Sequence, residues 1–125
     1  MSGKKESHKP EQFYSMPFAA LNEVAKVYGY GDEKYGPYNY LAGYKYSLSI
    51  DSLFRHLLAW LDGEQSDIDE SGYSHMAHVV WHGLHLLNMQ LNPAAYKKFD
   101  DRQGMPVAFD TGMYHADGFH QVDDD

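Results

Sequence analysis

Four histidines recur in one segment of the sequence at spacings that place them on a single face of a helix. At about 100° per residue they form one narrow stripe, made of His75, His78, His82 and His85. The opposite face is apolar and comprises Val80, Leu84, Leu87 and Leu91. The pattern predicts a helix that buries its apolar face and displays imidazoles, which are good ligands for zinc, manganese, iron and nickel. A solvated stripe or an interface stripe is the alternative interpretation.

A short acidic connection precedes these histidines. It closes with Ser71-Gly72, and its carboxylates are Glu64, Asp67, Asp69 and Glu70. Hard divalent cations prefer oxygen ligands and bring positive charge to phosphates. Acidic connections are also common as solvated turns, so both a metal-binding loop and a surface turn stay open at this point. The HExxH pattern is absent, which argues against a zincin-type protease.

Two polar flanks border the apolar stripe of the helix before this connection. Arg55 lies one turn after Asp51, where it can form a surface ion pair of small energetic value. His56 lies one turn before Trp60, and a histidine beside an apolar face is more often a packed core residue than a ligand. A functional role is the alternative, because Arg55-His56 is followed by four carboxylates and then by His75.

A segment rich in glycine and tyrosine lies closer to the N-terminus. Seven of the eleven tyrosines fall between Tyr28 and Tyr46, and Lys34 stands between Gly31 and Gly36. Lysine can meet a phosphate as a point charge, and tyrosine rings can stack on a base. Tyrosine clustering alone is weak evidence, however, since tyrosines also fill irregular cores, and the GxxxxGK[ST] pattern of a P-loop is missing.

Helical periodicity and capping residues predict an all-α fold: a small bundle of three to five helices with a long Tyr/Gly-rich loop. We expect the first helix to follow Ser15 as N-cap and Pro17, and to end at Gly29. Residues 29–46 would then form a long ordered loop with one helical turn at 32–35. Such long loops in compact domains are usually functional or disordered, and the aromatic content argues against disorder.

The remaining elements are predicted from the same signals. Apolar residues from Ile50 to Leu61 predict a second helix, ended by Gly63 and capped by Ser47 or Ser49. Ser74 caps a third helix that Pro93 stops near Asn92. Two aromatic residues further on, Tyr96 and Phe99, suggest a short helix.

The composition is that of one globular domain of 125 residues without cysteine. We expect residues 1–12 to form a flexible arm and residues 13–125 a single domain, whose tail at 93–125 lacks strong periodicity. The net charge of −8 argues against a nucleic-acid backbone as partner. No run approaches the roughly 18 apolar residues of a membrane span, and no signal sequence opens the chain, so we expect a cytoplasmic protein. A core this small favours a homo-oligomer, either a dimer or a tetramer.

An ordered series of short motifs resembles the phage dATP/dGTP diphosphohydrolases of the MazZ type. These are distant relatives of the MazG-like all-α nucleoside triphosphate pyrophosphatases. The resemblance covers about residues 9 to 91, and its matching pieces are Lys9-Pro10, Met16-Pro17-Phe18, Gly31 with Lys34-Tyr35-Gly36, Asn39-Tyr40, Arg55-His56-Leu57, Gly63-Glu64, Asp67, Glu70-Ser71-Gly72 and His75-x-x-His78. The chain departs from the superfamily's carboxylate motifs, because histidines occupy both positions of the expected ExxD.

The resemblance implies cleavage of a purine deoxynucleoside triphosphate, most plausibly dGTP, with GTP and dATP as other candidates, to the monophosphate and pyrophosphate. In some phages this reaction supplies dGMP for DNA that contains 2-aminoadenine, which would place the protein in the cytoplasm of the infected bacterium. Mg²⁺ or Mn²⁺ would be held by His56, Glu64, Asp67, Glu70, His75 and His78. Lys34 and Arg55 would neutralise phosphate charge as catalytic residues, and the substrate-binding residues would be Lys9, Tyr35, Asn39 and Trp60.

Two other functions stay open from the sequence. An HD-type phosphohydrolase, which releases intact triphosphate, is also helical and histidine-rich, but no His-Asp dipeptide occurs here. A non-catalytic module that binds a nucleotide or a protein would also explain a histidine stripe, if the stripe were an interface.

Overall fold

The computed structural model describes residues 2–6 and 8–105, and within them it is helical without a strand. Its helices are α1 (Phe18–Tyr35), α2 (Tyr46–Leu61), α3 (His75–Gln90) and α4 (Pro93–Tyr96), with 3₁₀ turns at Phe13–Ser15, Asn39–Ala42 and Lys97–Phe99. The all-α prediction is therefore confirmed. Within the described part of the chain, no helix is long and apolar enough to cross a membrane.

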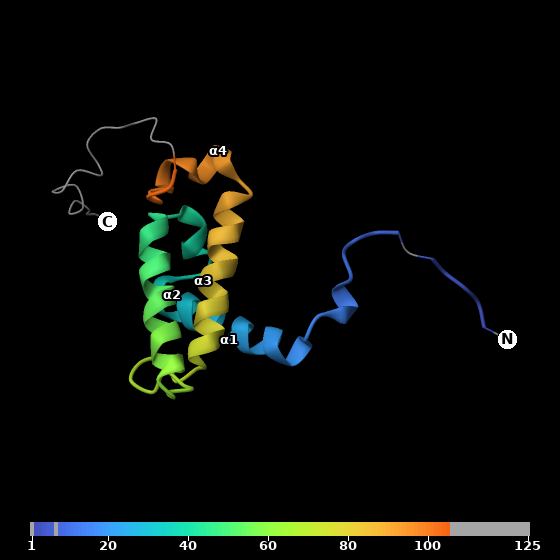
Figure 1. Ribbon diagram of the computed structural model, residues 1–125, viewed down its shortest axis with the longest axis horizontal. Helices are drawn as coiled ribbons and strands as arrows, with labels where there is room; N and C mark the ends of the chain where they lie inside the picture. The colour runs from blue at the N-terminus through green and yellow to red at the C-terminus, as the bar shows by residue number, and fades with distance from the viewer. Residues whose placement is uncertain (1, 7, 106–125) are drawn as a thin grey trace.

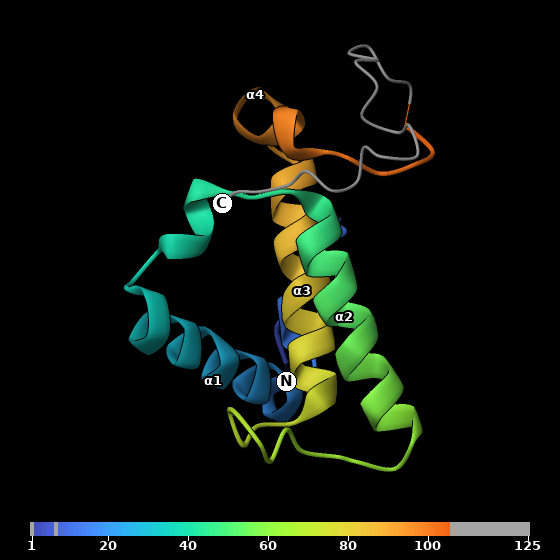
Figure 2. The same cartoon turned by 90° about the vertical axis from the view of Figure 1, so that its left-hand side faces the viewer.

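Helices α2 and α3 lie side by side and antiparallel, and they form the most extensive contact between elements (Figure 1). Helix α1 packs against α3 near the end at which the acidic connection joins α2 to α3, and α4 lies at the opposite end of α3 (Figure 2). At that opposite end a small core forms from Tyr46, Met89 and Tyr96. The Tyr96 hydroxyl donates to the carbonyl of Leu41 at 2.6 Å. The predicted short helix around Tyr96 and Phe99 is confirmed.

Helix α1 is longer than the sequence predicted. It continues through Gly29 and Gly31 to Tyr35, and it ends at Gly36, whose φ of 93° suits glycine. The predicted end at Gly29 was wrong because an interior glycine costs only about 1 kcal/mol, which packing can offset. Val24 and Val27 of α1 are buried. The predicted loop at 29–46 shrinks to residues 36–45, which include the Asn39–Ala42 turn.

Of the helix caps predicted from the sequence, the one at α3 is confirmed and those at α1 and α2 are wrong. The Ser74 hydroxyl accepts hydrogen bonds from two backbone N–H groups of the first turn of α3, so this cap is confirmed. Helix α2, however, begins at Tyr46 without a side-chain cap on its own N-cap residue, so the cap at Ser47 or Ser49 was wrong. The backbone N–H of Ser47 instead donates at 2.9 Å to Asp101, a residue distant in sequence. Ser15 also does not cap α1, which Pro17 precedes.

Helix α3 buries the face that the sequence predicted to be exposed, and it exposes the face predicted to be buried. His75, His78 and His85 are buried and His82 is half-buried, whereas the four apolar residues of the opposite face are exposed: Val80, Leu84, Leu87 and Leu91. The stripe itself was predicted correctly, but its direction was wrong. The imidazoles can be buried because α1, α2 and the acidic connection supply aromatic rings and hydrogen-bonding groups beside most of them.

The second predicted apolar stripe is only partly buried. Ile50, Leu53 and Leu57 of α2 are half-buried, while Phe54, Leu58 and Leu61 are exposed. The proposed division into an arm at 1–12 and a domain at 13–125 stays a prediction, and the part of the tail at 106–125 lies outside the described residues.

Candidate functional site

A cavity of about 620 Å³ lies among α1, the segment that follows it, α2, the acidic connection and α3. Its volume falls within the range of small-molecule sites. One group of lining side chains is aromatic: Tyr28, Tyr30, Tyr35, Tyr40, Tyr44 and Trp81. Another group is ionisable: Asp32, Lys34, His56, Asp67, Glu70, His78 and His82. The cavity therefore offers both flat apolar surfaces and charged groups to one ligand.

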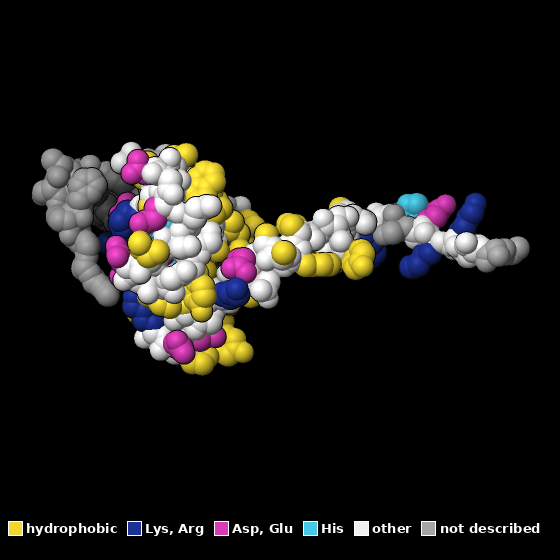
Figure 3. Space-filling view, turned by 90° about the horizontal axis from the view of Figure 1, so that it is seen from below, with side chains coloured by type: hydrophobic (Ala, Val, Ile, Leu, Met, Phe, Trp, Pro, Cys, Tyr) yellow, Lys and Arg dark blue, Asp and Glu magenta, His cyan; other side chains and the backbone are white. Residues whose placement is uncertain are grey.

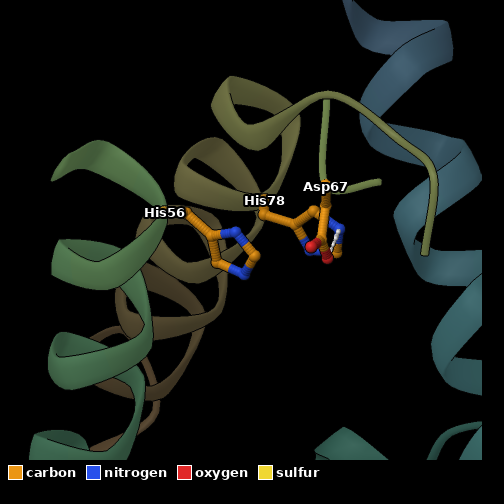
Figure 4. A group of neighbouring side chains, drawn as sticks. All are labelled: His56, Asp67 and His78. Carbon is orange, nitrogen blue, oxygen red and sulfur yellow. Dashed lines mark ion pairs between the residues drawn. The ribbon is translucent and has the colours of Figure 1, made fainter. Parts of the chain in front are cut away.

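Three potential metal ligands converge on the wall of this cavity. His56 comes from α2, Asp67 from the acidic connection and His78 from α3 (Figure 4). One ligand atom from each lies within 4.8 Å of the other two. His78 Nε2 lies 3.9 Å from Asp67 Oδ2, and the His56 and His78 rings are stacked with centroids 4.3 Å apart. Two nitrogen donors and one carboxylate form a set that fits a divalent transition-metal ion.

The histidines of this region are held neutral. Burial lowers the pKa of His56, and it lowers the pKa of His78 to about 4. The pKa of His82 falls to about 3, again mainly through burial and then through the neighbouring His56. At neutral pH these imidazoles therefore keep an unprotonated nitrogen, which is the form that binds a metal ion.

A hydrogen-bond chain runs behind His56. The carboxylate of Glu64 accepts from His75 Nε2 at 2.6 Å, and His75 Nδ1 lies 2.9 Å from His56 Nδ1. In the His75 tautomer that donates from Nε2 to Glu64, Nδ1 is the acceptor and His56 Nδ1 the donor, which leaves the lone pair on Nε2 of His56 free. Glu64 and His75 were predicted as metal ligands, but neither lines the cavity. Their hydrogen bonds lead to His56, so their positions suit groups that orient the His56 ring rather than bind a metal themselves.

A second set of contacts orients Asp67 and His78. The Ser71 hydroxyl lies 2.7 Å from His78 Nε2 and 3.3 Å from Asp67 Oδ2. The backbone N–H of Gly72 donates to the Asp67 carbonyl at 2.7 Å. Of the two aspartates in the acidic connection, Asp67 lines the cavity, whereas Asp69 is exposed and does not. The sequence analysis had noted Ser71 only as part of a motif and assigned it no role.

The predicted phosphate- and base-binding residues fall into two groups. Lys34, Tyr35 and Asn39 line the cavity, as does Glu70 of the predicted metal ligands. Lys34 Nζ lies 5.3 Å from the Tyr35 ring centroid, and its interaction with the Tyr35 hydroxyl raises the pKa of the lysine, which stays charged at neutral pH.

Arg55, Lys9 and Trp60 do not line the cavity. Arg55 is exposed, and its Nη2 donates to Ser52 Oγ at 2.9 Å; Ser52 itself lines the cavity. No described ion pair joins Arg55 to Asp51, so the surface pair that was one interpretation of Arg55 is not seen among the described residues. Trp60 lies outside the cavity near the end of α2.

The sequence analysis missed Trp81, which lines the cavity together with the predicted tyrosines. Trp81 lies between His78 and His82 in the sequence, and its ring centroid lies 5.6 Å from that of Tyr28. The hydroxyl of Tyr44 is linked to Ser49 at 2.8 Å, and Ser49 is linked to His82 Nδ1 at 2.9 Å. The tyrosine cluster was a usable signal, but only the fold shows that it meets Trp81 rather than Trp60.

Comparison with known proteins decides the family. The sequence model described as "dATP/dGTP diphosphohydrolase, N-terminal" matches residues 1–102. The chain belongs to this family. The matched region includes every described helix and all the residues that line the cavity. No curated protein and no solved structure matches the chain. The name of the family is that of a hydrolase that acts on nucleoside triphosphates.

Proposed function

We propose that the protein is a metal-dependent hydrolase that cleaves dGTP to dGMP and pyrophosphate. One observation carries the proposal: donors from three separate elements converge within 4.8 Å on the wall of a cavity that also presents Lys34 and a group of aromatic rings. A metal site beside a cation and stacking surfaces matches the phosphate and base portions of a nucleotide. Membership of the family supports the same substrate class.

His56, Asp67 and His78 are the proposed metal ligands, with Glu70 available from the same wall. The mixed nitrogen and oxygen donors favour Mn²⁺ over Mg²⁺, which prefers an all-oxygen shell. A bound ion would lower the pKa of a water and polarise a phosphate oxygen. Glu64 and His75 hold His56 in the tautomer that presents a free nitrogen.

Positive side chains and aromatic rings take the other roles. Lys34 neutralises phosphate charge inside the cavity, and Arg55 does so from its rim beside Ser52. Asn39 and Tyr35 contact the nucleoside, and Trp81 takes the stacking role that the sequence had given to Trp60.

The family resemblance supplies the proposed biological setting. The product dGMP would enter the phage pathway to 2-aminoadenine DNA in the cytoplasm of an infected bacterium. The working form would be a homo-oligomer, because much apolar surface of α2 and α3 is exposed in a single chain.

The test is to incubate the protein with Mn²⁺ and dGTP, or with dATP, GTP or dCTP, and to resolve the products. We expect dGMP and pyrophosphate, with purine deoxynucleotides preferred. Deoxyguanosine plus triphosphate would instead indicate an HD-type enzyme, and binding without turnover would indicate a non-catalytic module. Asp67→Asn should abolish turnover, whereas the matched change Asp69→Asn, on an exposed residue of the same connection, should preserve it.

A further inference from the structure

We propose that a second copy of the chain completes the nucleotide site, and that the N-terminal arm of that copy brings Lys9 to the triphosphate. The N-terminal arm is defined here as residues 8–17. The proposal rests on the proposed function for the identity of the ligand. It follows from three features of the described structure: the charge of the cavity, the outer face of α3 and the direction of the arm.

The cavity has too little positive charge for its ligand. Among the residues that line it, Lys34 is the one lysine or arginine, and it stands with the carboxylates of Asp32, Asp67 and Glu70. A triphosphate carries several negative charges, and enzymes of this chemistry meet them with metal ions together with positive side chains. The first twelve residues have a net positive charge from Lys4, Lys5 and Lys9, although the whole chain carries −8. Within the arm, the one lysine or arginine is Lys9, which can supply positive charge that the cavity lacks.

The outer face of α3 indicates where a second copy packs. From His75 to Gln90 the helix contains no aspartate, glutamate, lysine or arginine. Its outward residues are 44% to 72% exposed and recur at i, i+4, i+7 and i+11: Val80, Leu84, Leu87 and Leu91. A solvated helix face normally carries charged residues, whereas an uncharged apolar stripe at this spacing is typical of helix–helix contact. The same surface on a second copy is the complementary partner, as in a two-fold dimer.

The arm extends towards the space that this second copy would occupy. It leaves the body on the side of α3 and away from α2 (Figure 1). Every described residue from His8 to Ala20 is exposed, including Phe13 at 72% and Tyr14 at 90%. Hydrophobic side chains gather on the flank of the body that faces the arm and recur on the arm itself (Figure 3). Tyr14 contacts Phe18 of α1 edge to face, with ring centroids 5.7 Å apart, yet both rings and Phe13 stay exposed, and a second copy would cover them.

The arm is long enough for Lys9 to act at a distance from the start of α1. Phe18 follows Lys9 by nine positions, and an extended segment of that length spans about 30 Å. The direction of the arm and the exposed apolar face of α3 favour the cavity of a second copy over that of the same chain. The decisive experiment is therefore complementation between two defective chains.

Lys9→Ala has an intact cavity and a defective arm, and Asp67→Asn has an intact arm and a defective cavity. Each is expected to lose at least about 10-fold in dGTP turnover when it is purified alone. The two variants are co-expressed with different affinity tags, and the mixed oligomer is isolated through both tags. If the arm acts between copies, the mixed dimer contains one complete site of two and regains about half of the wild-type turnover. If the arm acts within its own chain, both sites are defective and no activity returns, which overturns the proposal. Lys98→Ala alone, on an exposed lysine outside the cavity, should keep wild-type turnover.

A second readout does not depend on activity, so failure of the proposed function is distinguished from failure of this inference. The chain has no cysteine, which allows Phe13→Cys to carry a single benzophenone label. Irradiation should give a covalent dimer from this variant and much less from Ile68→Cys, an equally exposed position in the acidic connection. Leu84→Glu combined with Leu87→Glu should reduce the mass in light scattering to that of one 14.3 kDa chain. Equal cross-linking at both positions, or a wild-type chain that is itself monomeric, would contradict the proposal.

Discussion

The buried histidines make stability depend steeply on pH, in a direction that their pKa values decide. The pKa of His78 and of His85 is lowered from 6.5 to about 4, and that of His82 to about 3, with burial as the main cause in each. In the unfolded chain these histidines titrate near 6.5. The folded state therefore binds fewer protons than the unfolded state between about pH 6.5 and 4. Their contribution is intact above pH 6.5 and is lost as the pH falls through that window.

The size of the effect follows from the number of groups. Each histidine that stays neutral in the folded state lowers the free energy of unfolding by about 1.4 kcal/mol for every pH unit below 6.5. His78, His82 and His85 together give about 4 kcal/mol per unit, and His56, whose pKa is also lowered by burial, adds to this slope. This is a large fraction of the 5–15 kcal/mol typical of a domain. We expect the melting temperature to fall by about 10–20 °C between pH 7 and pH 5.5.

His85 allows the reasoning to be tested at a single position. It is fully buried among Tyr40, Tyr44 and Trp81, and neither ring nitrogen has a hydrogen-bond partner in the described structure. His85→Leu should therefore reduce the slope of unfolding free energy against pH by about 1.4 kcal/mol per pH unit, whatever its effect at pH 7.

The assay is urea denaturation followed by circular dichroism at several values between pH 5.5 and 7.5. EDTA is present throughout, so that metal binding does not add its own pH dependence. His8→Leu is the matched control, since the His8 side chain is 86% exposed, and it should leave the slope unchanged. If His85→Leu and the wild-type protein show the same slope, the neutral buried histidine is not the cause and the reasoning is refuted.

Three further outcomes are expected. Arg55→Ala should lower kcat/KM for dGTP by about 10²-fold with less than about 1 kcal/mol change in stability, because the side chain is exposed; unchanged kinetics would remove it from catalysis. Glu64→Ala should weaken Mn²⁺ binding in calorimetry by about 10-fold, since His75 loses the acceptor that sets the tautomer of His56, and an unaltered affinity would count against that role. Gly43→Ala should destabilise the protein by more than about 2 kcal/mol, because φ is 81° and the new Cβ would lie 2.7 Å from two aromatic side chains. Gly29→Ala meets open space inside α1 and should stabilise the protein by up to about 1 kcal/mol. Equal melting temperatures for these two variants would contradict the packing at Gly43.

Local features of the sequence were enough to place most elements and the family. Ser74 caps α3 and Pro93 follows its end because both act on backbone groups within one turn, where no distant partner is needed. The periodicity from Ile50 to Leu61 marked α2 for the same reason. The ordered series of motifs identified the family without any knowledge of the fold. These are properties of neighbouring residues along the chain.

Tertiary packing decided what local rules leave open. A helical wheel gives the angles between side chains but not the partner that each face meets, so the histidine stripe could be found while its burial was predicted the wrong way round. The continuation of α1 past Gly29 has a similar origin, because buried contacts outweigh a propensity cost of about 1 kcal/mol. Among the carboxylates of the acidic connection, the sequence offered four oxygen donors of equal standing. Only the antiparallel packing of α2 against α3, with the fold of the connection between them, brings Asp67 to His56 and His78 and leaves Glu64 beside His75. These residues lie 11 and 22 positions apart, so they meet through the packing of helices rather than through their spacing.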